Sequence, residues 1–256
     1  MSKPYSTQLH QTAPSPRTSI IVPAYDEARF VPRLLRQFPP ELRRQLQLEL
    51  IVSDGGSSDE TVALARTHTD LVVEWKDSVP QNISIGRNRG AACARGEVLI
   101  FLNADVHVDD PERFIAEMTH ALNEEEVVAA TCNVRVNPEE EIVADRLFHR
   151  AFNRYCRFLN AIGMGMGRGE CQVVRKTVFD QAGGYNEAIP AGEDFEFFMR
   201  LRRRGKISFV STCTVFESPR RYRSFGYMRI ALLWFVNGVS VVLFHRSLSK
   251  QWTPVR

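Results

Sequence analysis

Several patterns that assign a protein to a function class at once are missing from this sequence. The five cysteines lie far apart and form no C-x-x-C pair, so the sequence predicts neither a zinc site nor a redox couple. No G-x-G-x-x-G follows the first predicted strand and no G-x-x-x-x-G-K-S/T occurs, which excludes the two common phosphate-cradling loops. The apolar run Ile230 to Val236 is far shorter than the ~20 residues that span a bilayer.

The composition is that of a globular protein in a reducing compartment. Hydrophobic residues make up 44% of the 256, and the formal net charge is only +3, whereas disordered chains are less apolar and more unevenly charged. Unpaired cysteines favour the cytoplasm. Residues 200–256 hold twelve Lys or Arg and one acid, while residues 1–199 hold 21 basic and 29 acidic residues. An acidic body with a basic end predicts that the two parts face different surroundings.

From residue 18 the chain alternates between strand and helix patterns. Short β-branched runs at 18–24, 48–53, 71–75 and 97–102 are separated by helical apolar spacing at 27–38, 61–65 and 85–94. This order predicts an α/β fold with a mainly parallel central sheet flanked by helices. Residues 1–17 are polar, hold three prolines and lack the apolar stretch of a secretory signal, so we expect a flexible tail.

Polar side chains gather where three of these strands end. Ligands of parallel sheets bind at the carboxyl ends of the strands, so we expect these side chains to line one site. They are Tyr25, Asp26 and Glu27 after the first strand, Asp54 and Asp59 after the second, and Asn103, Asp105 and His107 after the fourth.

Six motifs in series resemble the family 2 glycosyltransferases of the GT-A fold. They are Ile20-Ile-Val-Pro-Ala-Tyr-Asp-Glu, Ile51-Val-Ser-Asp-Gly-Gly-Ser-Ser-Asp-Glu-Thr, Gly86-Arg-Asn-Arg-Gly, Phe101-Leu-Asn-Ala-Asp, Gly183-Gly-Tyr-Asn-Glu and Gly192-Glu-Asp-Phe-Glu. Each alone is weak, but all six arrive in the order of the family. The resemblance implies a catalytic domain over 18–217, with a nucleotide-binding half at about 18–110 and an acceptor half at about 111–217. Residues 218–256 then form a basic, apolar helical extension.

The resemblance implies that the first two motifs bind the base and ribose of a nucleoside-diphosphate sugar. The residues concerned are Pro23, Tyr25, Glu27 and Asp54. Carboxylates suit this task because they accept hydrogen bonds from ring N–H groups and ribose hydroxyls. An alternative for Asp54 is an Asx-turn, and for Asp59 we favour a helix cap.

Asn103, Ala104 and Asp105 occupy the place of the family's D-x-D motif. There the resemblance implies contacts with the nucleotide and a divalent metal, Mn²⁺ or Mg²⁺, that neutralises the diphosphate. Asn103 replaces the first acid, so Asp105 is the expected ligand. His107 is a second candidate ligand, since histidine with carboxylate suits Mn²⁺, although a lone exposed histidine often has no such role. Asp109 and Asp110 are expected to cap a helix that starts at Pro111.

Two further motifs carry charge. Arg87 matches the family's Arg-Asn segment, and its planar fork fits a diphosphate; the alternative is a counter-charge for Asp54 or Asp105. Glu193 and Asp194 resemble the family's E-D pair, which implies that Asp194 is the general base of an inverting transfer, supported by Glu193. The alternative for Asp194 is a helix N-terminal acid stabilised by the helix dipole.

The basic C-terminal region predicts an apolar helix at 227–244 with flanking arginines. Peripheral contact of 220–250 with the inner face of the cytoplasmic membrane fits this pattern, because juxtamembrane Lys and Arg attract anionic lipid. The alternatives are packing on the catalytic domain and a homodimer interface. Nucleic-acid binding is not expected, since the body is acidic and no binding motif is present.

Together these patterns predict a metal-dependent inverting glycosyltransferase. It would move a sugar from a nucleoside-diphosphate sugar, with UDP and GDP both open, to a hydroxyl or phosphate acceptor such as a membrane lipid or polyprenyl phosphate. The alternatives are a non-catalytic nucleotide-sugar binding protein, which Asn103 favours, and a sugar nucleotidyltransferase. The last needs a Gly-rich basic signature after the first strand, which Pro23-Ala-Tyr-Asp-Glu is not.

Overall fold

The computed structural model describes residues 15–77, 81–244 and 247, so most of the expected N-terminal tail and the end of the C-terminal extension lie outside the described residues. The strands are β1 (Thr18–Ala24), β2 (Leu48–Asp54), β3 (Leu71–Glu74), β4 (Val98–Leu102), β5 (His107–Val108), β6 (Val127–Val136), β7 (Cys171–Arg175) and β8 (Lys206–Glu217). The helices are α1 (Val31–Leu35), α2 (Pro40–Leu46), α3 (Thr61–Arg66), α4 (Ile83–Cys93), α5 (Pro111–His120), α6 (Val143–Ala161), α7 (Lys176–Ala182), α8 (Glu193–Arg202), α9 (Arg220–Phe225) and α10 (Tyr227–Phe244).

The strands form one sheet in the order β3-β2-β1-β4-β7-β6-β8-β5. Strands β1, β2, β3 and β4 are parallel, as the alternating pattern predicts. Strands β6 and β8 are parallel as well, whereas β7 is antiparallel to both β4 and β6 and β5 is antiparallel to β8, so the sheet is mixed with parallel pairs in the majority. Because Cys171 at the start of β7 pairs with Leu102 at the end of β4, the glycine-rich loop over residues 163–169, before β7, arrives at the edge where the parallel strands end.

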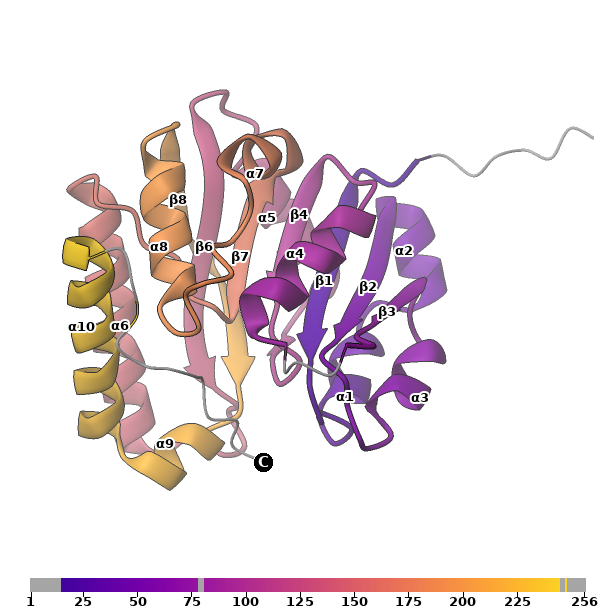
Figure 1. The fold of residues 1–256 in the computed structure, drawn as a ribbon, viewed down its shortest axis with the longest axis horizontal. Coiled ribbons are helices and arrows are strands. Elements are labelled where there is room, and N and C mark those ends of the chain that lie inside the picture. Colours follow the sequence, from indigo (N-terminus) through magenta and orange to yellow (C-terminus); the bar gives the residue numbers. More distant parts are fainter. Residues whose placement is uncertain (1–14, 78–80, 245–246, 248–256) are drawn as a thin grey trace, which may run out of the picture.

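Helices cover both faces of the sheet, which confirms the expected α/β class (Figure 1). Successive residues of β1 point to opposite faces, as in any strand. Ile20 and Val22 join the core beneath α1 and α5, whereas Ile21 joins the core beneath α4, α7 and α8. Helix α4 lies very close to β1, because a Cβ on Gly90 would come within 2.4 Å of Ile21 Cγ2. Burial on both faces explains the continuous apolar runs of these strands.

The C-terminal helices stand at the β8 side of the molecule, where α10 runs beside α6 (Figure 1). The Trp234 ring lies 6.0 Å from that of Phe148 and 5.1 Å from that of Phe152, both on α6. Arg223 on α9 pairs with the buried Asp145 of α6 at 2.6 Å. The predicted apolar helix is confirmed, and one side of it packs on the domain. Within the described ranges, no helix combines the length and apolarity that crossing a membrane requires.

Candidate active site at the carboxyl ends of the strands

Asp54 closes β2 and is almost completely buried. Its Oδ2 accepts hydrogen bonds from the backbone N–H groups of Gly56 at 2.8 Å and Ser57 at 3.0 Å, which is the Asx-turn alternative. Its Oδ1 is buried and has no hydrogen-bond partner among the residues that the structure describes. A buried carboxylate oxygen without a donor is costly, so the turn leaves Asp54 with one acceptor for the N–H or O–H of a ligand.

The loop after β1 lies against the loop after β2. Asp26, with a left-handed φ of 52°, accepts from the Ser58 N–H at 2.7 Å through its Oδ1. Asp59 Oδ1 accepts from the N–H of Thr61, the first residue of α3, at 2.9 Å, although the N-cap position itself is Glu60. These bonds hold the loop at the carboxyl ends of β1 and β2, where Tyr25 is 47% exposed and Pro23 half-buried. Two of the predicted nucleotide contacts therefore face an open surface.

Arg87 connects the predicted donor and acceptor halves. This residue of α4 is fully buried, and its Nη1 donates to Glu193 Oε1 at 2.8 Å. Its Nη2 donates to Asn103 Oδ1 at 3.2 Å and to the Gly169 carbonyl at 2.9 Å. Its carboxylate partner is Glu193, at the first position of α8, and not Asp54 or Asp105. The buried guanidinium brings the D-x-D position and the E-D pair into one site.

Asp105 contacts a guanidinium from the far end of the chain. Its Oδ2 lies 3.2 Å from Arg220 Nη2, and burial raises the pKa of its carboxyl while Arg220 lowers it. Ala104 between the two motif side chains is buried in the core. Among the described residues, no three His, Cys, Asp or Glu side chains are arranged to hold a metal. With Asn103 bonded to Arg87, the donor set here fits a cation that shares Asp105 with phosphate oxygens, as Mg²⁺ commonly does.

His107 and Asp105 have different partners. The His107 Nε2 lies 3.4 Å from Arg33 Nη2, and its ring stacks on Phe216 with centroids 5.1 Å apart. Burial, followed by the nearby Arg33, lowers the pKa of His107, which keeps the imidazole neutral at pH 7. Metal ligation by His107 stays a prediction, and no contact in the structure joins it to Asp105.

Glu193 and Asp194 form the first turn of α8, after Gly192 with a φ of +81°. Asp194 Oδ2 accepts from the Gly169 N–H at 2.9 Å, and its Oδ1 accepts from the Phe195 N–H at 2.8 Å. Burial, then the adjacent Glu193, raises the pKa of Asp194 to about 7. A carboxyl with this pKa is suited to taking up a proton near neutral pH. Asp194 therefore combines a hydrogen bond to the backbone of the first helical turn, which the helix-terminal alternative predicts, with the raised pKa of a candidate base.

Comparison with known proteins identifies the family of the chain and its fold. The model of the family described as glycosyl transferase family 2 matches residues 19–183. The chain belongs to this family. The O-antigen biosynthesis protein RfbC of Myxococcus xanthus is 30% identical over 213 residues, which are 75% of this chain and 16% of that protein. The dolichyl-phosphate beta-glucosyltransferase of Mus musculus is 27% identical over 159 residues, which are 56% of this chain and 48% of that protein.

The fold of this family 2 chain also matches solved structures. The mannosyltransferase PcManGT of Pyrobaculum calidifontis, solved with GDP-Man and Mn²⁺, gives a TM-score of 0.70 at 18% identity, covering 90% of this chain and 64% of that one. This likeness supports the GT-A fold. The chain spans about half or less of the length of the two curated relatives above.

Sequence reasoning missed a buried ionic cluster beside the family 2 motifs. Arg168, from the glycine-rich loop, donates to Glu170 at 3.1 Å and to Glu217 at 3.1 Å. Burial, then Glu170, raises the pKa of Glu217 well above its ordinary value, and Tyr222 donates to the same carboxylate at 2.7 Å. The Glu170 charge also raises the pKa values of Asp105 and Asp194. The signal in the sequence is the pair of opposite charges in Arg168-Gly169-Glu170, directly before β7.

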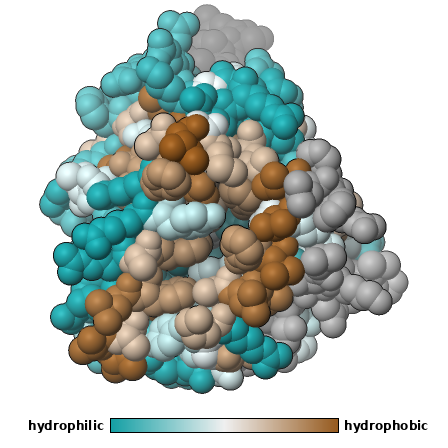
Figure 2. Space-filling model, turned by 90° about the vertical axis from the view of Figure 1, so that its left-hand side faces the viewer, coloured by the Kyte–Doolittle hydropathy of each residue, from teal (hydrophilic) through white to brown (hydrophobic). Residues whose placement is uncertain are grey.

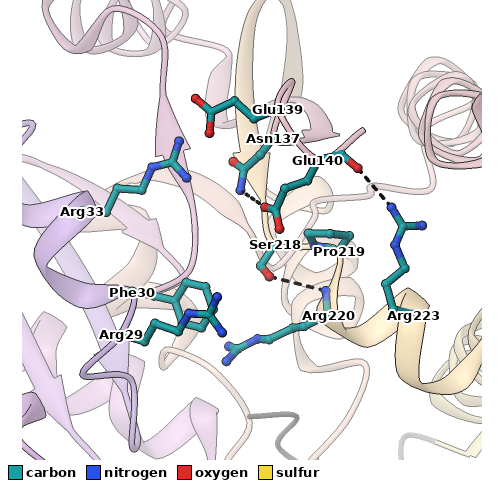
Figure 3. A pocket seen from close by; sticks show the side chains of 10 residues that line it. All are labelled: Arg29, Phe30, Arg33, Asn137, Glu139, Glu140, Ser218, Pro219, Arg220 and Arg223. Carbon is teal, nitrogen blue, oxygen red and sulfur yellow. Dashed lines mark hydrogen bonds between the residues drawn. The ribbon is translucent and has the colours of Figure 1, made fainter. Parts of the chain in front are cut away.

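Arg220 is the second functional candidate that the sequence analysis did not single out. Figure 3 shows it at the floor of a pocket beside Phe30, with Arg29 nearby. It forms an ion pair with Glu27 as well as with Asp105, and its guanidinium lies 4.6 Å from the centre of the Phe30 ring. Burial raises the pKa of Glu27, and Arg220 opposes that rise. The sequence analysis counted Arg220 only as one of the basic charges of the extension.

Proposed function

We propose that this protein is an inverting glycosyltransferase that moves a sugar from a nucleoside-diphosphate sugar to a hydroxyl or phosphate acceptor. The observation that carries the proposal is the Arg87 bridge, because one buried guanidinium touches Asn103 at the D-x-D position and Glu193 beside the candidate base. Donor binding and proton removal therefore share one rigid support. The family 2 membership of the chain supports the same reaction class.

Asp194 is the proposed general base. The acceptor, either a hydroxyl or the P–OH of a phosphate monoester, transfers its proton to the Asp194 carboxylate as its oxygen bonds to the anomeric carbon, and the bond from that carbon to the nucleoside diphosphate breaks on the opposite face. With a pKa of about 7, about half of the Asp194 side chains are ionised at pH 7. The hydrogen bonds from Gly169 and Phe195 hold the carboxylate in place without using a charged partner.

Asp105 is the proposed protein ligand of a divalent metal that arrives with the donor. Such a cation would offset the charge of the departing diphosphate. Pro23, Tyr25, Glu27 and Asp54 are the proposed base and ribose side of the site, and the bare Asp54 Oδ1 supports this for Asp54. PcManGT was solved with GDP-Man and Mn²⁺, which favours a similar donor and metal here.

We further propose a lipid-linked acceptor reached by peripheral contact with anionic lipid. Figure 2 shows apolar side chains gathered on the face that α6 and α10 form. Phe158 and Leu147 on α6 are 58% and 62% exposed, and Leu232 and Phe235 on α10 are 63% and 64% exposed. The arginines of α6 at 146, 150, 154 and 157 are exposed, and its one acid, Asp145, is buried. An apolar, cationic face without exposed acids on these helices fits a negatively charged membrane surface.

The relative named dolichyl-phosphate beta-glucosyltransferase favours a polyprenyl phosphate as that acceptor. A non-catalytic nucleotide-sugar binding protein is the second candidate, because Asn103 lacks the charge of an acid and is held by Arg87. Both candidate functions require binding of the nucleotide-sugar donor, but only the glycosyltransferase turns the donor over.

The deciding experiment is a screen of UDP- and GDP-sugars with undecaprenyl phosphate in anionic vesicles, measured as acceptor-dependent release of nucleotide. We expect turnover with one donor class. Asp194→Asn should reduce turnover by about 10²–10⁴-fold, the usual contribution of a general base, while donor affinity stays within a few-fold. Asp180→Asn, at an exposed position of α7, is the control. Donor binding without turnover in the wild type would favour the second candidate, and full turnover by Asp194→Asn would remove Asp194 from the base role.

A further inference from the structure

One nitrogen of Arg220 serves two carboxylates from separate loops. Its Nη2 lies 2.5 Å from Glu27 Oε1, in the loop after β1, and 3.2 Å from Asp105 Oδ2, in the loop after β4. Strands β1 and β4 are neighbours in the sheet, so the two carboxylates face the same space. The guanidinium is therefore a cation that both carboxylates share.

The rest of the Arg220 guanidinium remains available to a ligand. A guanidinium carries five N–H donors in a planar fork, and Nη2 alone makes the contacts with Glu27 and Asp105. Its Nη1 and Nε have no hydrogen-bond partner in the part of the chain that the structure describes. The side chain is 20% exposed and opens on the pocket of Figure 3. A planar fork with unused donors matches two oxygens of a phosphate.

Neighbours of Arg220 on α9 hold this helix to β8 and to α6. Tyr222 donates to Glu217 at the end of β8, and Arg223 pairs with Asp145 on α6. The Phe30 ring supports the guanidinium from the side of the first loop. The fork is thus held in position before any ligand binds, which reduces the entropy lost on binding.

We infer that Arg220 is a ligand of the donor's diphosphate and, in the donor-free protein, the internal counter-ion of Asp105. This inference rests on the proposed function. Before a donor binds, the guanidinium pairs with Asp105 and Glu27 through Nη2; when a nucleoside diphosphate enters, the Nη1 and Nε donors bind its phosphate oxygens. Besides its proposed contact with the base or ribose, Glu27 positions the Arg220 guanidinium. A cation that binds Asp105 without nucleotide must compete with the guanidinium.

Two binding measurements with opposite expected signs test this. In Arg220→Gln, calorimetry with UDP and GDP should show at least a tenfold loss of affinity, whereas UMP and GMP should bind within about twofold of the wild type. Mn²⁺ alone, followed by electron paramagnetic resonance, should bind Arg220→Gln more tightly than the wild type. Arg220→Lys keeps the charge and loses the fork, so its diphosphate affinity should be intermediate. Arg29→Gln is the matched control, since Arg29 also lies over Phe30 and has no carboxylate partner in the described chain.

The outcomes separate the inference from the proposed function. If the wild type binds neither UDP nor GDP, the proposed function fails and the inference fails with it. If the wild type binds one of them and Arg220→Gln binds it equally well, the inference alone is wrong. An equal loss of monophosphate, diphosphate and Mn²⁺ affinity would mean that Arg220 merely supports the loops, and would also overturn it. Arg220→Lys provides the same comparison if the glutamine variant does not fold.

Discussion

Replacing Asp194 by asparagine should make the protein less sensitive to rising pH. The wild-type carboxyl has a pKa of about 7 in the folded state against an ordinary value of 3.8, and burial is the main cause. The folded state therefore holds the proton more tightly than the unfolded state. The stability that this supplies is fully present below about pH 4 and is lost as the pH rises through 7. Asparagine does not titrate, so the variant lacks this loss.

The magnitude follows from the two pKa values. Linkage gives a decrease of about 2–3 kcal/mol in wild-type unfolding free energy, relative to the variant, between pH 5 and pH 8. Solvent screening of the half-buried side chain lowers this to about 2 kcal/mol. The variant also loses one of the two hydrogen bonds from Gly169 and Phe195, because asparagine offers one acceptor oxygen. That loss of about 1–3 kcal/mol does not vary with pH, so the slope isolates the titration.

The assay is urea denaturation of both proteins at several pH values from 5 to 8. The difference in unfolding free energy between variant and wild type should move by about 2 kcal/mol in favour of the variant across this range. Asp180→Asn, on an exposed turn of α7, should show no such trend. Parallel pH profiles for Asp194→Asn and wild type would refute the reasoning, because they would mean that Asp194 ionises equally in both states.

Three other substitutions probe the supports of the site and its outer face. Arg87→Gln leaves Glu193 buried without its cation, so urea denaturation should show a loss of about 3–5 kcal/mol; a loss below 1 kcal/mol would contradict the bridge. Gly192→Ala forces a φ of +81° on a residue with a Cβ, and calorimetric melting should reveal a cost of about 1–2 kcal/mol. Leu232→Glu should lower binding to anionic vesicles about tenfold in flotation assays. Leu71→Glu, at an exposed position of β3, is the control and should leave binding unchanged. A changed oligomeric state of Leu232→Glu with unchanged flotation would instead indicate that the α6–α10 face is a dimer interface.

Local chemistry made much of the fold readable from the sequence. The β-branched runs of β1, β2 and β4 needed no distant contact to be recognised, and Asp110 caps α5 by accepting from the Arg113 N–H, as its position before Pro111 predicts. The apolar spacing predicts no helix between 39 and 47, yet helix α2 begins at Pro40. Proline is equally suited to the first helical position, where its missing N–H costs nothing. The reversed direction of β7 depends on pairing with β4 and has no local signature.

The site was predictable only where its residues follow a strand or begin a helix. Asp54, Asp105 and Asp194 stand at such positions. The partners of the two arginines could not be predicted from the sequence, because Arg87 pairs with Glu193 across 106 residues of chain and Arg220 pairs with Glu27 across 193. Such pairs form only when the whole sheet has assembled. A count of charges along the chain does not show which charges meet. The net charge of +11 over residues 200–256 therefore gives no indication that Arg220 pairs with Glu27 and Asp105 at the carboxyl ends of the strands.

The position of Arg220 after the last strand affects how the molecule can be divided. A fragment ending at Glu217 would keep all eight strands, yet Glu27 and Asp105 would face each other with no cation between them. Such a fragment would also uncover the Phe148 and Phe152 rings of α6 and leave Asp145 buried without Arg223. Shortened versions made for crystallisation or fusion should retain α9 and α10, and a tag or partner domain should be joined beyond them.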